Sequence, residues 1–118
     1  MSINLFGFGH VASEDVTGNK TVDITDQGVV QNVTASATVT LPATVVGYSY
    51  TVRVGGEGLT VAVSPAAADL IAGGNFTAVD NKDLLFTDLP AGSYVTLVGN
   101  GTTGWNIVAI SDGVTYEA

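Results

Sequence analysis

Acid–base and nucleophilic chemistry has few candidate residues in this chain. His10 is the only histidine, and cysteine is absent from all 118 residues. Catalysis near neutral pH most often uses histidine held rigidly by its neighbours, whereas His10 lies in an irregular stretch interrupted by glycines. The absence of cysteine removes disulfides, thiolate nucleophiles and thiolate metal sites. We therefore expect no catalytic residue.

Carboxylates are the only abundant reactive groups. A glycoside hydrolase needs two carboxyl groups about 5 to 9.5 Å apart across a cleft, usually beside aromatic platforms. The tryptophan and the four tyrosines lie in alternating segments that are more typical of a core or an interface. Glycan hydrolysis is therefore the least supported function. The close acidic groups are Glu14-Asp15, Asp23 with Asp26, and Asp80-Asn81-Lys82-Asp83.

Metal and phosphate sites are not indicated either. Asp80, Asn81 and Asp83 could offer oxygen ligands to Ca²⁺, but EF-hand spacing and Asp-rich repeats are absent, so we interpret this segment as a solvated turn. The glycine-rich segment 55–58 lacks both the Lys-Ser/Thr pair and the helix of a phosphate-binding loop. We expect no metal and no cofactor.

The charge of the chain restricts its partners. Eleven acidic and three basic residues give a formal net charge of −8. Lys20, Arg53 and Lys82 are scattered, so no basic patch can neutralise phosphates or attract anionic lipid. No run approaches the roughly 18 apolar residues that a membrane span requires. We expect neither nucleic acid nor a membrane as a partner.

The composition is typical of a protein that works in an assembly. Hydrophobic residues make up 46% of the chain and charged residues 12%, about half the usual charged share. A surface short of charge is often covered by neighbouring molecules.

Alternation of apolar and polar residues from Lys20 onward predicts β-strands separated by glycine and proline turns. We expect hairpins between 47–54 and 59–64 and between 93–99 and 105–110, with Trp105 as a core anchor. The pattern predicts an all-β fold: a single antiparallel β-sandwich or jelly-roll-like domain over 20–118, with no internal repeat. The expected strands are 21–25, 29–34, 37–41, 47–54, 59–64, 84–86, 93–99 and 105–110, with a short strand or turn around Leu70 and Ile71 and an edge strand within 112–118.

Residues 1–19 are interrupted by glycines and polar residues, which predicts an extended N-terminal arm. The arm carries large apolar side chains that water solvates poorly. Either they fold back on the domain or they dock on another molecule. These residues are Ile3, Leu5, Phe6 and Phe8, followed by His10.

Three segments together resemble a small β-domain of tailed-phage virion proteins, which include capsid decoration or head-fibre proteins and the tips of tail fibres. The segments are QNVTASATVTLPATVVGYSYTVRV, LTVAVSPAAADLIAGG and GSYVTLVGNGTTGWNIVAI. The shared features are Leu41-Pro42 ending a Thr-rich strand, Gly47-Tyr48 beginning the next, the stretch from Val63 to Gly73, and Gly104-Trp105 opening a late strand.

The resemblance implies a structural protein that is not an enzyme: a homotrimer on the outer surface of a phage head, as a capsid decoration (cement) or head-fibre protein. Its partners would be further copies of itself and the major capsid protein. An N-terminal arm typically reaches onto the capsid or a neighbouring subunit in such proteins. The implied contact residues are Ile3, Leu5, Phe6, Phe8 and His10.

A second function stays open: a receptor- or carbohydrate-binding module of a phage fibre tip or a cell surface. Aromatic side chains stack on sugar rings, and host-surface glycans would then be the partner. Tail fibres typically have a long N-terminal shaft, which we do not expect here because the 118 residues show no such segment. The aromatic candidates are Tyr48, Tyr50, Tyr94, Tyr116 and Trp105.

Overall fold

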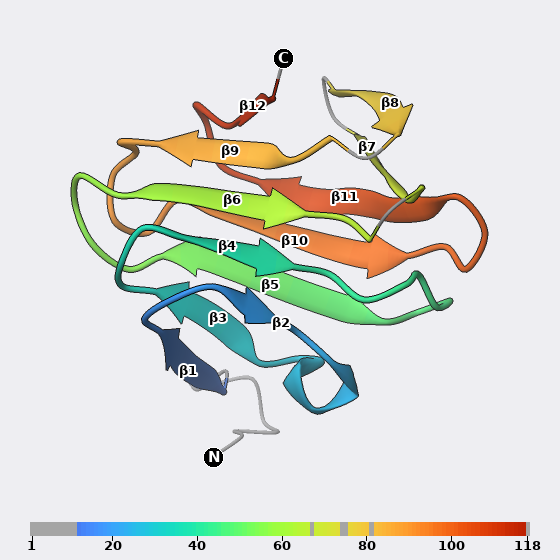
Figure 1. Ribbon diagram of the computed structural model, residues 1–118, viewed down its shortest axis with the longest axis horizontal. Coiled ribbons are helices and arrows are strands. Elements are labelled where there is room, and N and C mark those ends of the chain that lie inside the picture. Colours follow the sequence, from blue (N-terminus) through green and yellow to red (C-terminus); the bar gives the residue numbers. More distant parts are fainter. Residues whose placement is uncertain (1–11, 67, 74–75, 81, 118) are drawn as a thin grey trace.

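The computed structural model describes residues 12–66, 68–73, 76–80 and 82–117, with the backbone alone for 76–80. These residues form two β-sheets packed face to face, with principal extents of 35 × 32 × 24 Å (Figure 1). The expected all-β class is confirmed. The described residues contain no α-helix with the length and apolarity needed to pass through a bilayer.

The two sheets differ in size, and both are mixed among the described strands. The large sheet has the order β1 (Ser13–Val16), β3 (Val30–Val33), β5 (Ser49–Val54), β10 (Tyr94–Gly99), β11 (Gly104–Ile110), β7 (Leu70–Gly73) and β8 (Phe76–Asp80). The small sheet has the order β12 (Thr115–Tyr116), β9 (Leu84–Thr87), β6 (Thr60–Ser64), β4 (Ala37–Thr40) and β2 (Lys20–Thr21). A 3-10 turn, η1, spans Ile24–Asp26.

The first six strands alternate between the sheets and form three stacked coils, which we number from the N-terminus: β1 with β2, β3 with β4, and β5 with β6. Like strands of successive coils pair in parallel, so β3 lies between β1 and β5 and β4 lies between β2 and β6. The expectation of antiparallel sheets is therefore wrong for this half. The coils repeat the same path without repeating the sequence.

The expected hairpin between 47–54 and 59–64 is also wrong. β5 and β6 lie in different sheets, and the glycine-rich segment 55–58 carries the chain from one sheet to the other. Alternation with a period of two identifies the inward face of each strand, but it does not identify the neighbouring strand. A hairpin and a crossing between sheets therefore have the same sequence pattern.

Antiparallel strands extend the coils toward the C-terminus. β10 pairs with both β5 and β11, and β9 pairs with β6. The hairpin of β10 and β11 confirms the second expected hairpin, with a register shift between Thr96 and Leu97. The short strands expected near Leu70 and over 84–86 are present as β7 and β9, and β12 supplies the expected C-terminal edge strand.

Valine ladders fill the space between the sheets. Val16, Val33 and Val54 occupy matching positions in β1, β3 and β5, and all are buried. Each such side chain stabilises the fold by about 1.5–3 kcal/mol relative to an exposed one. Trp105 is 1% exposed and packs against Tyr50 with ring centroids 5.5 Å apart, which confirms its position in the core.

At one end of the molecule, the loops around Thr44, Leu70 and Gly104 pack so closely that their backbones are in contact. Thr44 Oγ1 donates a hydrogen bond of 2.6 Å to the Gly104 carbonyl, and Asp69 Oδ2 accepts from the Thr44 N–H at 3.0 Å. A Cβ atom at Gly104 would lie 2.1 Å from the Leu70 carbonyl oxygen, and Gly104 has a φ of +150°. Glycine is therefore required at this position by both contact and conformation.

Replacing Gly104 with alanine should destabilise the fold by about 2–4 kcal/mol, because overpacking and a strained backbone each cost about 1–3 kcal/mol. Urea unfolding followed by Trp105 fluorescence measures this change. Gly18→Ala is the control, since nothing lies within 4 Å of its added Cβ, and its effect should stay within about 0.5 kcal/mol. Equal stability of the two variants would contradict the close approach at Gly104.

Candidate functional site: the N-terminal edge

The residues expected to contact a partner, Ile3, Leu5, Phe6, Phe8 and His10, lie outside the described residues. The end of the stretch expected as an arm belongs to the fold. Ala12 and Val16 are buried, and β1 pairs with β3 in the large sheet. Residues 1–11, which carry the expected contact residues, immediately precede β1 in the chain, so the surface around β1 is the candidate site.

This surface, which we call the N-terminal edge, consists of β1 and β2. Within the described part of the chain, β1 is the end strand of the large sheet and β2 is the end strand of the small sheet (Figure 1). An edge strand presents backbone N–H and C=O groups that can pair with a further strand. The edge thus has the backbone geometry of a docking surface.

The side chains inside this edge are polar where the later coils are apolar. Glu14 occupies the position of Gln31 and Val52 in the neighbouring strands of the large sheet. Lys20 occupies the position of Val39 and Val63 in the small sheet. Both charged residues therefore stand in rows that point between the sheets.

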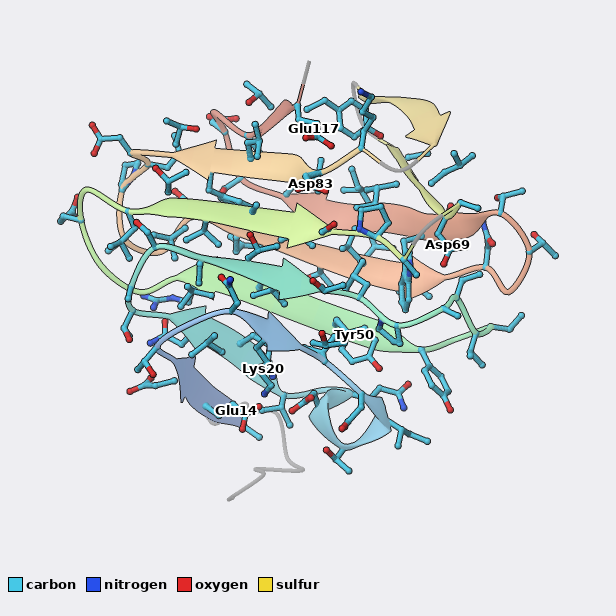
Figure 2. All side chains as sticks on the ribbon, viewed as in Figure 1. Glu14, Lys20, Tyr50, Asp69, Asp83 and Glu117 are labelled. Carbon is cyan, nitrogen blue, oxygen red and sulfur yellow. The ribbon has the colours of Figure 1, made fainter. Side chains whose placement is uncertain are left out.

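A single ammonium group connects the two sheets across this polar layer. Lys20 Nζ donates hydrogen bonds to Glu14 Oε1, to Asp26 Oδ1 at 2.9 Å and to Gln31 Oε1 at 2.8 Å. A lysine ammonium has three N–H donors, so these acceptors use its full capacity. Figure 2 shows Lys20 and Glu14 at the edge formed by β1 and β2. We call Glu14, Lys20, Asp26 and Gln31 the Lys20 cluster.

The cluster becomes more buried toward the core. The side chains of Glu14, Lys20 and Asp26 are 44%, 28% and 10% exposed, and Gln31 is fully buried. Gln31 Nε2 donates to the Val29 carbonyl at 3.2 Å. The polar layer is thus exposed to solvent at Glu14 and buried at Gln31. A polar group on the buried side needs a hydrogen-bond partner.

The 3-10 turn fixes the carboxylate of Asp26. Asp23 precedes the turn and its Oδ1 accepts from the Thr25 N–H at 2.9 Å, while Asp26 Oδ2 accepts from the Asp23 N–H at 3.0 Å. The Tyr50 hydroxyl donates to the Asp23 carbonyl at 2.9 Å, which ties the turn to β5. This reciprocal capping box leaves the other Asp26 oxygen directed at Lys20.

The electrostatics favour the charged form of both central groups. Burial alone would lower the pKa of Lys20, but its hydrogen bonds and charge interactions with Glu14 and Asp26 raise that pKa above 10.5. Burial alone would raise the pKa of Asp26, but the hydrogen bond from the Asp23 N–H and the Lys20 ammonium lower that pKa below 3.8. Favourable partners outweigh desolvation at both groups.

The outer surface of the large sheet carries a second polar ladder beside the cluster. Asn32 Nδ2 donates to Asp15 Oδ1 at 3.0 Å, and Arg53 Nη1 donates to Asn32 Oδ1. These residues occupy matching positions in β1, β3 and β5. Polar contacts therefore attach the first coil to the others both between the two sheets and on the outer face of the large sheet.

The other chemical candidates do not converge on one place. Asp23 and Asp26 cap the 3-10 turn η1. Asn81 and the side chain of Asp80 lie outside the described part. No group of three or more metal-ligating side chains occurs among the residues that the structure describes. Of the aromatic residues considered for sugar stacking, Tyr50 and Trp105 are buried, whereas Tyr94 is 37% exposed.

The Lys20 cluster was missed by the sequence analysis, which treated Lys20 as one of several scattered cations. A signal for it exists in the sequence. Glu14 precedes the buried Val16 by two residues, and Lys20 precedes the buried Val22 by two. In a β-strand, residues i and i+2 share a face, so each charge lies in phase with a core position.

Comparisons of the chain with protein-family models, with curated proteins and with solved structures found no match.

The Lys20 cluster should make folding stability depend on pH at both extremes. The stabilisation from Asp26 is complete above the unfolded pKa near 3.8 and is lost as the pH falls through the lower folded-state pKa. The stabilisation from Lys20 is complete below the unfolded pKa near 10.5 and is lost as the pH rises through the raised folded-state pKa of Lys20. Urea unfolding at a series of pH values measures the free energy of unfolding and so both the acid limb, where stability falls with falling pH, and the alkaline limb, where it falls with rising pH.

Asp26→Asn should flatten the acid limb by removing the titrating group. Asp112→Asn removes an exposed carboxylate outside the cluster and should keep the wild-type acid limb. An acid limb that is the same in wild type and in Asp26→Asn would contradict the assignment.

Proposed function

We propose that this chain is a structural virion protein of a tailed phage, which decorates the outside of the capsid as a homotrimer. The resemblance of its strand segments to virion β-domains suggests this role. The observation that carries the proposal is the polarity of the fold: the N-terminal arm joins the domain at one edge, and the C-terminal strand forms the opposite edge of the small sheet (Figure 1).

The polarity suits a module that is anchored at one end. The chain enters at β1 through the buried Ala12, so any pull on the arm is transmitted to the core. At the opposite edge, the Glu117 N–H donates to the Asp83 carbonyl at 3.0 Å, and Glu117 Oε1 accepts from the Asp83 N–H at 3.1 Å. Ala12 and Glu117, near the two ends of the described chain, are thus both held by the fold. In the proposed orientation, β1 faces the shell and β12 faces away from it.

The proposed attachment uses the apolar side chains of the arm, Ile3, Leu5, Phe6 and Phe8, against the major capsid protein. Burial of apolar area contributes roughly 25 cal/mol per Å². Three arms in a trimer act together, so individually weak contacts give firm attachment through their high effective concentration. The role is contact and reinforcement without catalysis.

Deleting residues 2–11 should abolish binding to phage heads and leave the domain folded, because the deletion stops before the buried Ala12. Purified protein is mixed with heads that lack it, and co-sedimentation measures saturable binding. Trp105 fluorescence during urea unfolding reports whether the truncated domain is intact. Binding of the truncated protein at wild-type levels would exclude the arm as the anchor.

A matched variant distinguishes the effect of the apolar side chains on binding from the effect of shortening the chain. Serine at positions 3, 5, 6 and 8 keeps the arm but removes its apolar surface, and it should bind as poorly as the deletion. Thr115→Lys places a charge at the opposite edge on an exposed residue of β12 and should bind like wild type. Loss of binding in Thr115→Lys alone would reverse the proposed orientation.

The proposal also predicts the state of the free protein. Sedimentation velocity at micromolar concentration should show one species with three times the mass of the 11.9 kDa chain. A low share of charged residues favours such self-association. A stable monomer under these conditions would contradict the trimer.

A further inference from the structure

The N-terminal edge has the backbone geometry to accept a second copy of the chain. Each coil adds one strand to the large sheet and one to the small sheet, and the first coil ends both stacks of described strands. Neighbouring strands lie about 4.7–4.9 Å apart, so one approaching edge can pair with β1 and β2 together. A stack of this kind continues unless something ends it.

One inward row of the large sheet stays apolar to its end, whereas the adjacent row and the matching row of the small sheet become polar toward the first coil. Val54 and Val33 continue to Val16 in one row, whereas Val52 is followed by Gln31 and then by Glu14 in the adjacent row. In the small sheet, Val63 and Val39 are followed by Lys20. A second copy stacked on this edge would cover these charged groups.

Covering the edge is unfavourable for charged groups in particular. The Glu14 side chain is 44% exposed and the Lys20 side chain 28% exposed, so both keep contact with water on the outer side. Stacking would remove that water without supplying a new partner, because the three donors of Lys20 already have acceptors. Inward-pointing charge on an end strand is a known means of blocking edge-to-edge association.

We infer that the Lys20 cluster closes the N-terminal edge against a second copy of this chain. The ammonium completes the core for one molecule and makes the same surface unfavourable for end-to-end stacking. The inference concerns the edge of the folded domain, and it holds whether or not the proposed virion function is correct.

The test replaces the two charges with the residue that the next coils use. Glu14→Val with Lys20→Val continues the valine rows and leaves the net charge unchanged, so weaker repulsion cannot explain any association. Sedimentation velocity over a range of concentrations should show particles of about twice the wild-type mass or more, in a share that rises with concentration. Wild type should keep a single sedimentation coefficient.

The matched control adds the same two valines to the outward face of the same strands. Ser13→Val with Thr21→Val changes exposed positions, also at constant net charge, and it should sediment like wild type. Association in this control to the same degree would show that added surface hydrophobicity, rather than loss of the cluster, drives stacking, and it would overturn the inference.

A second variant covers the case in which the valine pair does not fold. Glu14→Gln with Lys20→Met keeps the side-chain volumes and the net charge, and urea unfolding followed by Trp105 fluorescence identifies which variant folds. A folded variant that keeps the wild-type sedimentation coefficient at all concentrations would contradict the inference.

Discussion

The bridge from the Lys20 ammonium to Glu14, Asp26 and Gln31 is the contact on which the N-terminal half of this domain depends. Stacked coils bury their valines only between neighbours, so the first coil needs another way to end the core. One cation with three oxygen acceptors meets that need, because it joins β2 of the small sheet to β1 and β3 of the large sheet. The valine rows that follow are protected from water at this end by the polar layer.

The same layer gives the molecule two different ends. At the N-terminal edge the core ends in the charged groups of the Lys20 cluster, and the buried Ala12 precedes β1 there. Toward the C-terminus, β9 and β10 continue the two sheets with antiparallel pairing and β12 ends the small sheet, while β11 pairs with β7 in parallel. A fold with distinct ends can present one to a support and the other to the surroundings, which is the physical basis of the proposed decoration role.

Local sequence patterns predicted the all-β class, the core position of Trp105 and the hairpin of β10 and β11. They did so because alternation reports which side chains face the core, and a glycine-containing turn between adjacent antiparallel strands is a local structure. They could not predict the pairing of β3 with β5, since the partner strand lies about twenty residues away and leaves no mark on either pattern. The Lys20 cluster was missed for a related reason: the phase of Glu14 with Val16 and of Lys20 with Val22 indicates that both charges face inward, but only the strand pairing shows that they meet.

The central claim is that the proposed arm, which precedes β1, attaches the domain to the capsid, so that the N-terminal side of the domain faces the shell. Electron cryo-microscopy of phage heads that lack this protein, after addition of the purified chain, tests it most directly. The account predicts trimeric density at defined lattice positions, with β1 and β2 nearest the shell and β12 farthest from it. Absence of ordered density, or ordered density with β12 against the shell, would contradict it.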